Sequence, residues 1–180
     1  MIQTYFCASS SLLISLLLAI LCISPAQSRL GVKIGQDVLT NLCSKTEDSS
    51  FCLQALKSDP QTTTTDLWGI AGLSINLAKT TVTKTHTFIK SQLDQTTDPQ
   101  LKRQYSQCLD SYDDAIGNIE YAAQTFSSND YGGVNSAASA CMTDVSDCQD
   151  ATSSLPQQNK ESNLLCKIKL LISQRLLETN

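Results

Sequence analysis

The stretch that decides the fold is Asp98–Phe126, DPQLKRQYSQCLDSYDDAIGNIEYAAQTF. Asp98 can cap a helix with its carboxylate, and Pro99 suits the first helical position because its missing N–H would have no partner there. Apolar side chains then recur in steps of four and three; they are Leu101, Tyr105, Cys108, Tyr112, Ala115, Ile119, Ala122 and Phe126. This spacing places them on one stripe of a helix. The stretch therefore predicts an amphipathic helix from Asp98 to about Thr125 whose stripe faces a protein core.

Three further helices are predicted around this one. Apolar residues at spacings of three and four indicate helices at about 66–95, 131–150 and 161–178. The polar run 157–159 after Pro156 is interpreted as the link between the last two helices. Four amphipathic helices with short connections pack most simply as an up-down-up-down bundle. The predicted fold class is all-α.

The N-terminal residues have the features of an export signal. Leu12–Ile23 is an apolar run of twelve residues, too short to cross about 30 Å of hydrocarbon. Ala26 and Ser28 supply the small side chains that signal peptidase accepts. We predict a signal peptide at 1–28, a mature domain at 29–180 with its core at about 33–177, and a secreted protein with no membrane span after cleavage.

Cleavage at that position leaves six cysteines in an oxidising compartment: Cys43, Cys52, Cys108, Cys141, Cys148 and Cys166. The short interval between Cys43 and Cys52 favours a helical hairpin closed by this pair. Cys108 and Cys148 lie on the buried stripes of successive predicted helices and could bridge them. Cys141 lies two turns before Cys148 on the same stripe and competes for that role. Periodicity alone leaves the choice open.

The composition argues against several function classes. The chain has one histidine, His86, whereas a catalytic triad, a Cys-His pair and a His-based metal site each need a histidine at a particular place. It also has no Cys-x-x-Cys spacing. A net charge of −4 would repel a polyanion such as nucleic acid. We therefore expect a monomeric binding protein with no catalytic residue, metal, cofactor or nucleic-acid partner. His86 lies in a Thr-rich segment and is expected to be an exposed polar residue.

The acidic residues are concentrated in the middle of the chain. No basic residue occurs between Arg103 and Lys160, whereas eight acidic ones do: Asp110, Asp113, Asp114, Glu120, Asp130, Asp144, Asp147 and Asp150. On the helix that starts at Asp98, the side opposite the stripe presents Asp110, Asp114, Gly117, Tyr121 and Gln124. One interpretation is a solvated face that keeps the protein soluble. The other is a docking face for a basic protein.

Five stretches resemble one known family in order, spacing and residue type. They are Phe51–Leu56 with Ser58–Pro60, Asp98–Lys102 leading through Tyr105 to Cys108, Tyr112–Ala115, Asp130–Tyr131, and Ser136–Ala138 through Cys148 to Asp150. The family that they resemble is that of the plant invertase and pectin methylesterase inhibitors, and the resemblance covers the mature chain. It implies a four-helix bundle with an N-terminal helical hairpin, secreted to the apoplast and cell wall.

The resemblance also implies a disulfide framework. It places disulfides at Cys43 with Cys52 and at Cys108 with Cys148. Cys166 matches a position at which many members keep an unpaired cysteine, and Cys141 matches one that usually holds a small residue such as Ala. The resemblance therefore leaves the state of Cys141 and Cys166 unassigned.

The expected target follows from the turn before the third bundle helix. Members that resemble invertase inhibitors typically carry Pro-Lys-Phe there, whereas this chain has Asp130-Tyr131-Gly132, which is more similar to pectin methylesterase inhibitors. The resemblance thus implies a protein that covers the active-site cleft of a pectin methylesterase. Its predicted contact residues are Asp110, Asp114, Tyr121, Gln124, Asp130 and Tyr131.

Two other functions stand beside this one. The first is inhibition of a cell-wall or vacuolar acid invertase, because both inhibitor types share the fold. The second is a small secreted lipid carrier, against which the chain lacks the adjacent Cys-Cys and the Cys-x-Cys of plant lipid-transfer proteins.

Overall fold

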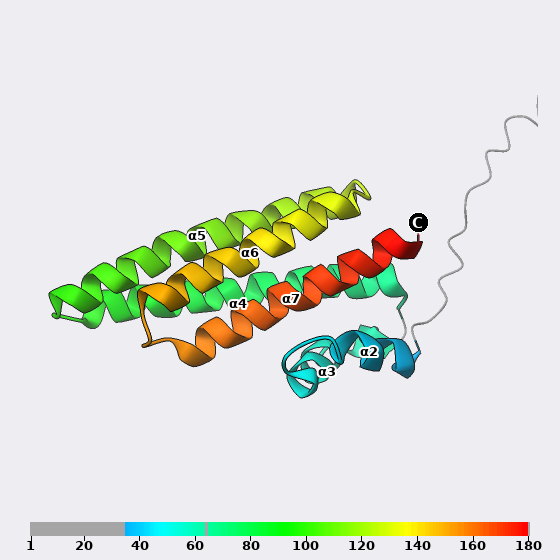
Figure 1. Cartoon of the computed structure of the whole chain (residues 1–180), viewed down its shortest axis with the longest axis horizontal. Helices are drawn as coiled ribbons and strands as arrows, with labels where there is room; N and C mark the ends of the chain where they lie inside the picture. Colours follow the sequence, from blue (N-terminus) through cyan, green and yellow to red (C-terminus); the bar gives the residue numbers. More distant parts are fainter. Residues whose placement is uncertain (1–34, 64, 180) are drawn as a thin grey trace, which may run out of the picture. The chain divides into compact units, whose positions relative to one another are not determined.

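A computed structural model describes residues 35–63 and 65–179, so the predicted signal peptide lies outside the described residues. The described chain is helical throughout (Figure 1). In chain order the elements are α2 (Gln36–Cys43), α3 (Ser49–Lys57), the 3-10 turn η1 (Pro60–Thr63), α4 (Leu67–Gln95), α5 (Pro99–Ser127), α6 (Tyr131–Ala151) and α7 (Pro156–Thr179). None of these helices is both long enough and apolar enough to span a membrane.

Helices α4 to α7 form the predicted up-down-up-down bundle. Each packs beside its neighbour in the chain, and α4 also packs beside α7, which closes the bundle (Figure 1). The stripe predicted for the Asp98 helix is buried on α5 at every position after Leu101, which is partly buried. This stripe supplies much of the core between α5 and its neighbours.

Aspartates begin three of the four bundle helices. Asp98 accepts hydrogen bonds from the backbone N–H groups of Gln100 and Leu101 at 2.7 and 3.1 Å, as its sequence position predicts. Asp66 caps α4 through Gly69 N–H at 2.9 Å in the same way. These carboxylates satisfy backbone donors that have no partner inside the helix and interact favourably with its positive end.

The start of the last helix differs from the prediction. Residues 157–159, which we expected in a linker, belong to α7, and the helix begins at Pro156. Proline is compatible with a first helical turn because its N–H is not needed there. Asn159 is fully buried, and its Oδ1 accepts a hydrogen bond from the Tyr112 hydroxyl at 2.9 Å. This polar contact inside the bundle explains why a run that is polar in sequence is helical.

The N-terminal hairpin consists of α2 and α3. A disulfide joins Cys43 to Cys52 at its turn, with the two Cα atoms 5.5 Å apart. Asp48 caps α3 through the N–H of Phe51 at 2.9 Å and forms an ion pair with Lys160 of α7 at 3.0 Å. The N–H of Phe51 and the Lys160 ammonium lower the pKa of Asp48 below its usual value. The hairpin is thus attached to the bundle by an ion pair as well as by packing.

Two disulfides cross-link the bundle itself. Cys108 of α5 is joined to Cys148 of α6, which is the pairing that the resemblance implies. Cys141 of α6 is joined to Cys166 of α7, with Cα atoms 6.0 Å apart. Cys141 is therefore not a competitor for Cys108, and neither of the two thiols that the sequence left unassigned is unpaired in this structure.

Candidate functional site

The outward side of α5 carries the residues that the sequence singled out. Asp110, Asp114, Gly117, Tyr121 and Gln124 are all exposed, and the Tyr121 side chain is 51% exposed. Tyr121 is therefore a large aromatic side chain in water, on the same side of α5 as Asp110 and Asp114. The predicted orientation of this helix is confirmed.

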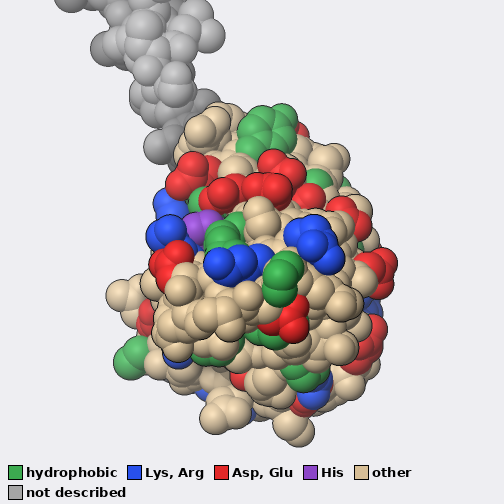
Figure 2. Space-filling model, turned by 90° about the vertical axis from the view of Figure 1, so that its left-hand side faces the viewer, with side chains coloured by type: hydrophobic (Ala, Val, Ile, Leu, Met, Phe, Trp, Pro, Cys, Tyr) green, Lys and Arg blue, Asp and Glu red, His purple; other side chains and the backbone are tan. Residues whose placement is uncertain are grey.

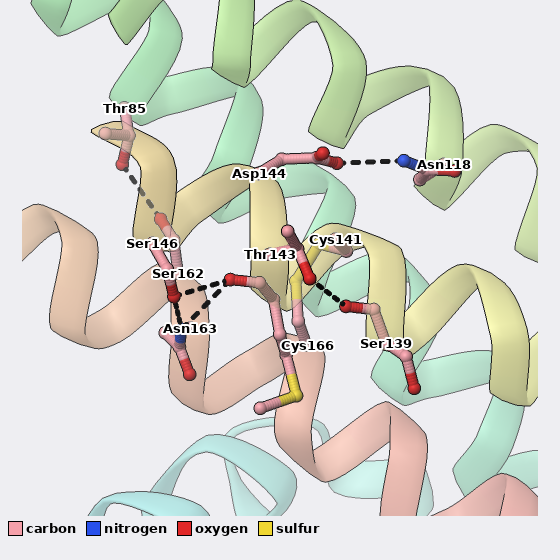
Figure 3. Close-up of a disulfide and its surroundings, with 11 residues drawn as sticks. Thr85, Asn118, Ser139, Cys141, Thr143, Asp144, Ser146, Ser162, Asn163 and Cys166 are labelled. Atoms are coloured by element: carbon pink, nitrogen blue, oxygen red, sulfur yellow. Dashed lines mark hydrogen bonds between the residues drawn. A yellow bond between two sulfur atoms is a disulfide. The ribbon is translucent and has the colours of Figure 1, made fainter. Parts of the chain in front are cut away.

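Helix α6 contributes two further carboxylates to the same surface, Asp144 and Asp147. Asn118 of α5 donates a hydrogen bond from Nδ2 to Asp144 Oδ2 at 2.8 Å. Figure 3 shows Asp144 directed toward Asn118, whereas Cys141, one turn earlier on α6, is directed toward Cys166 of α7. We call the surface formed by Asp110, Asp114, Asn118, Tyr121, Asp144 and Asp147 the acidic face. The sequence marked Asp144 only as one of eight acidic residues and did not mark Asn118.

The acidic face keeps its charge unpaired at the surface. Two other acids of α5 point toward α4: Glu120 pairs with Lys79 at 3.1 Å, and Asp113 Oδ1 lies 3.1 Å from His86 Nε2. By contrast, Asp110, Asp114 and Asp147 form no ion pair with any cation in the described part of the chain. The contact with Asp113 also corrects our expectation for His86, whose side chain is only 24% exposed.

Electrostatics inside the acidic face centre on Asp144. Partial burial raises the pKa of Asp144, while the hydrogen bond from Asn118 lowers it. The nearby carboxylates of Asp114 and Asp147 raise that pKa further, and Lys169 lowers it. The carboxylates of Asp114 and Asp147 are thus close enough to Asp144 to affect its ionisation. Figure 2 views the end of the bundle with the α4–α5 and α6–α7 turns, and acidic side chains gather toward the side on which α5 and α6 lie.

The two residues predicted at the α5–α6 turn differ in their exposure. Asp130 is exposed and caps α6, because its Oδ1 accepts a hydrogen bond from the N–H of Gly133 at 2.8 Å. Tyr131 is only 5% exposed, packs near Phe126 and donates its hydroxyl to Asn129 at 3.1 Å. Tyr131 is therefore mostly buried in the core, and its role as a contact residue stays a prediction. Its position three residues before Val134 places it on the buried stripe of α6.

The acidic face consists of carboxylates, one amide and one exposed aromatic side chain. In the part of the chain that the structure describes, no group of three or more His, Cys, Asp or Glu side chains could hold a metal ion. All six described cysteines are in disulfides, so none of them is a nucleophile. The face thus presents negative charge and one exposed aromatic ring to the solvent.

Residues 37–172 match the sequence family described as plant invertase/pectin methylesterase inhibitor. The chain belongs to this family. It is 40% identical over 175 residues to the pectinesterase inhibitor of Actinidia deliciosa. The alignment covers 93% of this chain and 95% of that relative. A relative from Platanus acerifolia, 32% identical over 79% of this chain and 87% of its own length, has a name that points to invertase.

The fold is also shared with solved structures of this family. A mutant form of a pectin methylesterase inhibitor from Arabidopsis superposes with a TM-score of 0.69 at 31% sequence identity. The match covers 76% of this chain and 95% of that structure. The helical bundle and the N-terminal hairpin are therefore those of a family of enzyme inhibitors.

Proposed function

We propose that this chain inhibits a plant pectin methylesterase by docking its acidic face over the active-site cleft of the enzyme. The observation that carries the proposal is the group of carboxylates on α5 and α6 that form no ion pair within the described residues, together with the exposed Tyr121 on the same side of α5. Support comes from the 40% identity to a pectinesterase inhibitor over nearly the whole chain. Many target methylesterases of this family are basic, so an acidic face complements them in charge.

The two parts of the acidic face would act at different steps of binding. Exposed carboxylates such as Asp110 and Asp114 raise the rate of encounter with a basic enzyme, because their field acts over about one Debye length. Tyr121 offers a large apolar surface with few rotatable bonds, which is the kind of side chain that dominates interface energies. The inhibitor therefore needs no chemistry of its own, since it acts by excluding substrate.

The scaffold supports such docking because the two helices that bear the face are already held in place before the enzyme binds. The disulfide between Cys108 and Cys148 joins the two helices that bear the face. The hydrogen bond from Asn118 to Asp144 links the same two helices. A surface that is already ordered loses little conformational entropy when a partner binds.

A second candidate function is inhibition of an acid invertase. The name of the Platanus acerifolia relative favours it. The turn before α6 does not, because Asp130-Tyr131-Gly132 stands where invertase-type members carry Pro-Lys-Phe. In addition, Tyr131 is buried and offers little surface to an enzyme.

We further propose that the inhibitor is secreted to the apoplast and the cell wall. On this proposal residues 1–28 are a signal peptide, and residues 29–180 form the inhibitor domain. The apolar run Leu12–Ile23 and the disulfides support export to an oxidising compartment.

The function is tested by adding the purified protein, residues 29–180, to a basic plant pectin methylesterase and to an acid invertase, and measuring both activities. We expect inhibition of the methylesterase and none of the invertase. The reverse pattern would favour the second candidate and contradict the proposal.

The docking face is tested with two charge-matched variants. Asp110→Asn with Asp114→Asn should slow association with the methylesterase several-fold at low salt, and the difference should vanish toward 1 M salt, where the Debye length is about 3 Å. Asp37→Asn with Asp94→Asn makes the same change of net charge at exposed positions of α2 and α4 and should leave association nearly unchanged. Equal effects of both variants would show that net charge, rather than this face, steers the encounter.

A further inference from the structure

A groove lies between α4 and α7, on the side of the bundle away from the acidic face. In the closed bundle α4 packs beside α7 and α5 packs beside α6, so these two pairs form opposite sides (Figure 1). The groove has a volume of about 280 Å³, and its lining includes Lys84, Thr85 and Phe88 of α4 and Gln157, Gln158 and Glu161 of α7. Small-molecule sites begin at about 300 Å³, so this groove suits one small ring rather than a large ligand.

Phe88 is the apolar part of the groove. Its side chain is 40% exposed, and it lies outside the apolar core of the bundle. An exposed aromatic ring at the wall of a groove offers a flat apolar surface to a ligand. Packing of the core does not account for an aromatic residue at this position, whereas contact with a ligand does.

Polar groups surround Phe88 in the groove. Gln157 and Gln158 carry amides, which both donate and accept hydrogen bonds. Gln157 Nε2 also donates to Glu161 Oε1 at 2.6 Å, which orders this wall. Thr85 is buried, and its hydroxyl lies 3.4 Å from that of Ser162 on α7, so this pair joins the two helices behind the groove (Figure 3). One aromatic surface among many donors and acceptors matches a pyranose sugar, which has C–H groups on a face of its ring and hydroxyls around its edge.

The charges of the groove favour an uncharged ligand. Lys84 is exposed and forms no ion pair with any acid in the described part of the chain. Glu161 supplies one negative charge to the same groove, so the charges of these two side chains balance. The whole chain has a net charge of −4, which repels a polyanion. A sugar polymer with free carboxylates is therefore disfavoured.

We propose that the groove binds one uncharged sugar ring, whose C–H face stacks on Phe88 and whose hydroxyls bond to Gln157 and Gln158. The source of this ring is a methyl-esterified pectin chain. That identity rests on the proposed function, because methyl-esterified pectin is the substrate of a pectin methylesterase. Its esterified sugar units have no free carboxylate and are uncharged. Bound in this way, the inhibitor is held on the substrate polymer, and the acidic face on the other side of the bundle stays free for the enzyme.

The direct test is an NMR titration of the purified protein, residues 29–180, with a trimer of galacturonic acid in which every carboxyl group is a methyl ester. We expect saturable shifts of the side-chain amide signals of Gln157 and Gln158. Phe88→Ala should weaken binding about fivefold, which corresponds to the loss of an aromatic contact of about 1 kcal/mol. The control Trp68→Ala removes an exposed aromatic ring of α4 outside this groove and should leave the affinity unchanged. Absence of saturable binding, or equal losses in the two variants, would overturn the proposal.

A second titration tests the charge of the ligand. The same trimer with free carboxylates should bind several-fold more weakly at low salt, and the difference should shrink as salt screens the repulsion. In Glu161→Gln the free-acid trimer should regain part of this affinity. The control Glu178→Gln, which removes an exposed acid at the other end of α7, should not change it. Tighter binding of the free-acid trimer by the native protein would indicate an anion site and contradict the proposal.

These titrations contain no enzyme, so their outcome is separate from that of the inhibition assay. A protein that binds the esterified trimer without inhibiting the methylesterase would keep the sugar site and contradict the proposed function. A protein that inhibits the enzyme without binding the trimer would contradict the sugar site alone.

Discussion

Helices α5, α6 and α7 differ from α4 in how they are held. Disulfides join α5 to α6 and α6 to α7, so these three helices form one cross-linked group. Helix α4 contains no cysteine and is held by apolar packing and by contacts at its surface, such as the Lys79–Glu120 ion pair. The acidic face lies entirely within the cross-linked group. The part of the bundle that we propose for binding is thus the part whose helices are least free to move apart.

The acidic residues also differ between the α4 side and the α6 side of α5. Acids of α5 that point toward α4 have cationic or imidazole partners, whereas Asp110, Asp114 and Asp147 form no ion pair with any cation in the described part of the chain. Surface ion pairs contribute little to stability. The seam between α4 and α5 therefore depends on its buried apolar side chains, and the carboxylates between α5 and α6 remain available to a partner.

The largest expected effect comes from removing the Cys108–Cys148 disulfide. Replacing both residues with Ala should lower the free energy of unfolding by about 4 kcal/mol, because the bond closes a long loop that the unfolded chain would otherwise explore. Urea unfolding of the variant and the native protein measures this. A loss below about 1 kcal/mol would show that the cross-link does not distinguish this group from α4. Peptide mapping without reduction that found Cys108 joined to Cys141 would contradict the framework itself.

A second effect is a pH dependence that belongs to the buried Lys169. Its pKa is about 8 in the folded protein and 10.5 in the reference state, so between these values the unfolded chain binds more protons at this site. The free energy of unfolding should therefore rise with pH across this range, by about 3 kcal/mol in total from this group.

The control is Lys169→Met, in which this rise should be absent. Unfolding by urea from pH 7 to 10 compares the two proteins. Tyr112, whose pKa burial raises from 10.0 to about 12, affects both alike as the pH approaches 10, so the difference between the proteins reports Lys169. Identical slopes in the two proteins would show that Lys169 is not buried as a charge.

A third prediction compares an exposed aromatic residue of the cross-linked helices with one of α4. Tyr121→Ala should weaken binding to the methylesterase by about 1 to 2 kcal/mol, mainly through faster dissociation. Trp68 of α4 is 41% exposed and stacks on Phe126 outside the acidic face, so Trp68→Ala should leave the dissociation rate unchanged. Surface plasmon resonance gives both rates. A larger effect at Trp68 than at Tyr121 would move the binding surface to α4.

The smallest effect is expected at the seam between α4 and α5. His86→Ala removes a contact with Asp113, whose side chain is 68% exposed, and should change the free energy of unfolding by less than about 0.5 kcal/mol. Thermal or urea unfolding near neutral pH measures this. A loss above about 1.5 kcal/mol would show that polar contacts hold α4 more strongly than we infer.

Periodicity predicted most of the fold because the same stripe decides both helix formation and burial. The limits of α4, α5 and α6 lie within two residues of the predicted ones, and an aspartate that precedes each helix marks its start. The start of α7 was not predicted because residues 157–159 are polar. Asn159 is stabilised inside the bundle by a hydrogen bond from Tyr112 of α5, and the spacing of residues within one helix does not show this contact.

The site was only partly predictable for the same reason. Tyr121 and the carboxylates of α5 follow from the face of one helix. The burial of Lys169 and the pairing of Cys141 with Cys166 require the helices to be placed together. A signal for Lys169 was present, since it lies between Leu165 and Ile172 on the buried stripe of α7, where a charged residue is unexpected. Spacing alone cannot name the partner of such a residue.

The most direct test of the proposed docking face is hydroxyl-radical footprinting of the inhibitor, alone and with a basic pectin methylesterase. Tyr121 and Trp68 are both exposed aromatic side chains that react in the free protein, and they lie on α5 and α4 respectively. We predict that the enzyme protects Tyr121 from oxidation and leaves Trp68 as reactive as before. Protection of Trp68 with no change at Tyr121 would contradict the assignment of the acidic face as the surface that meets the enzyme.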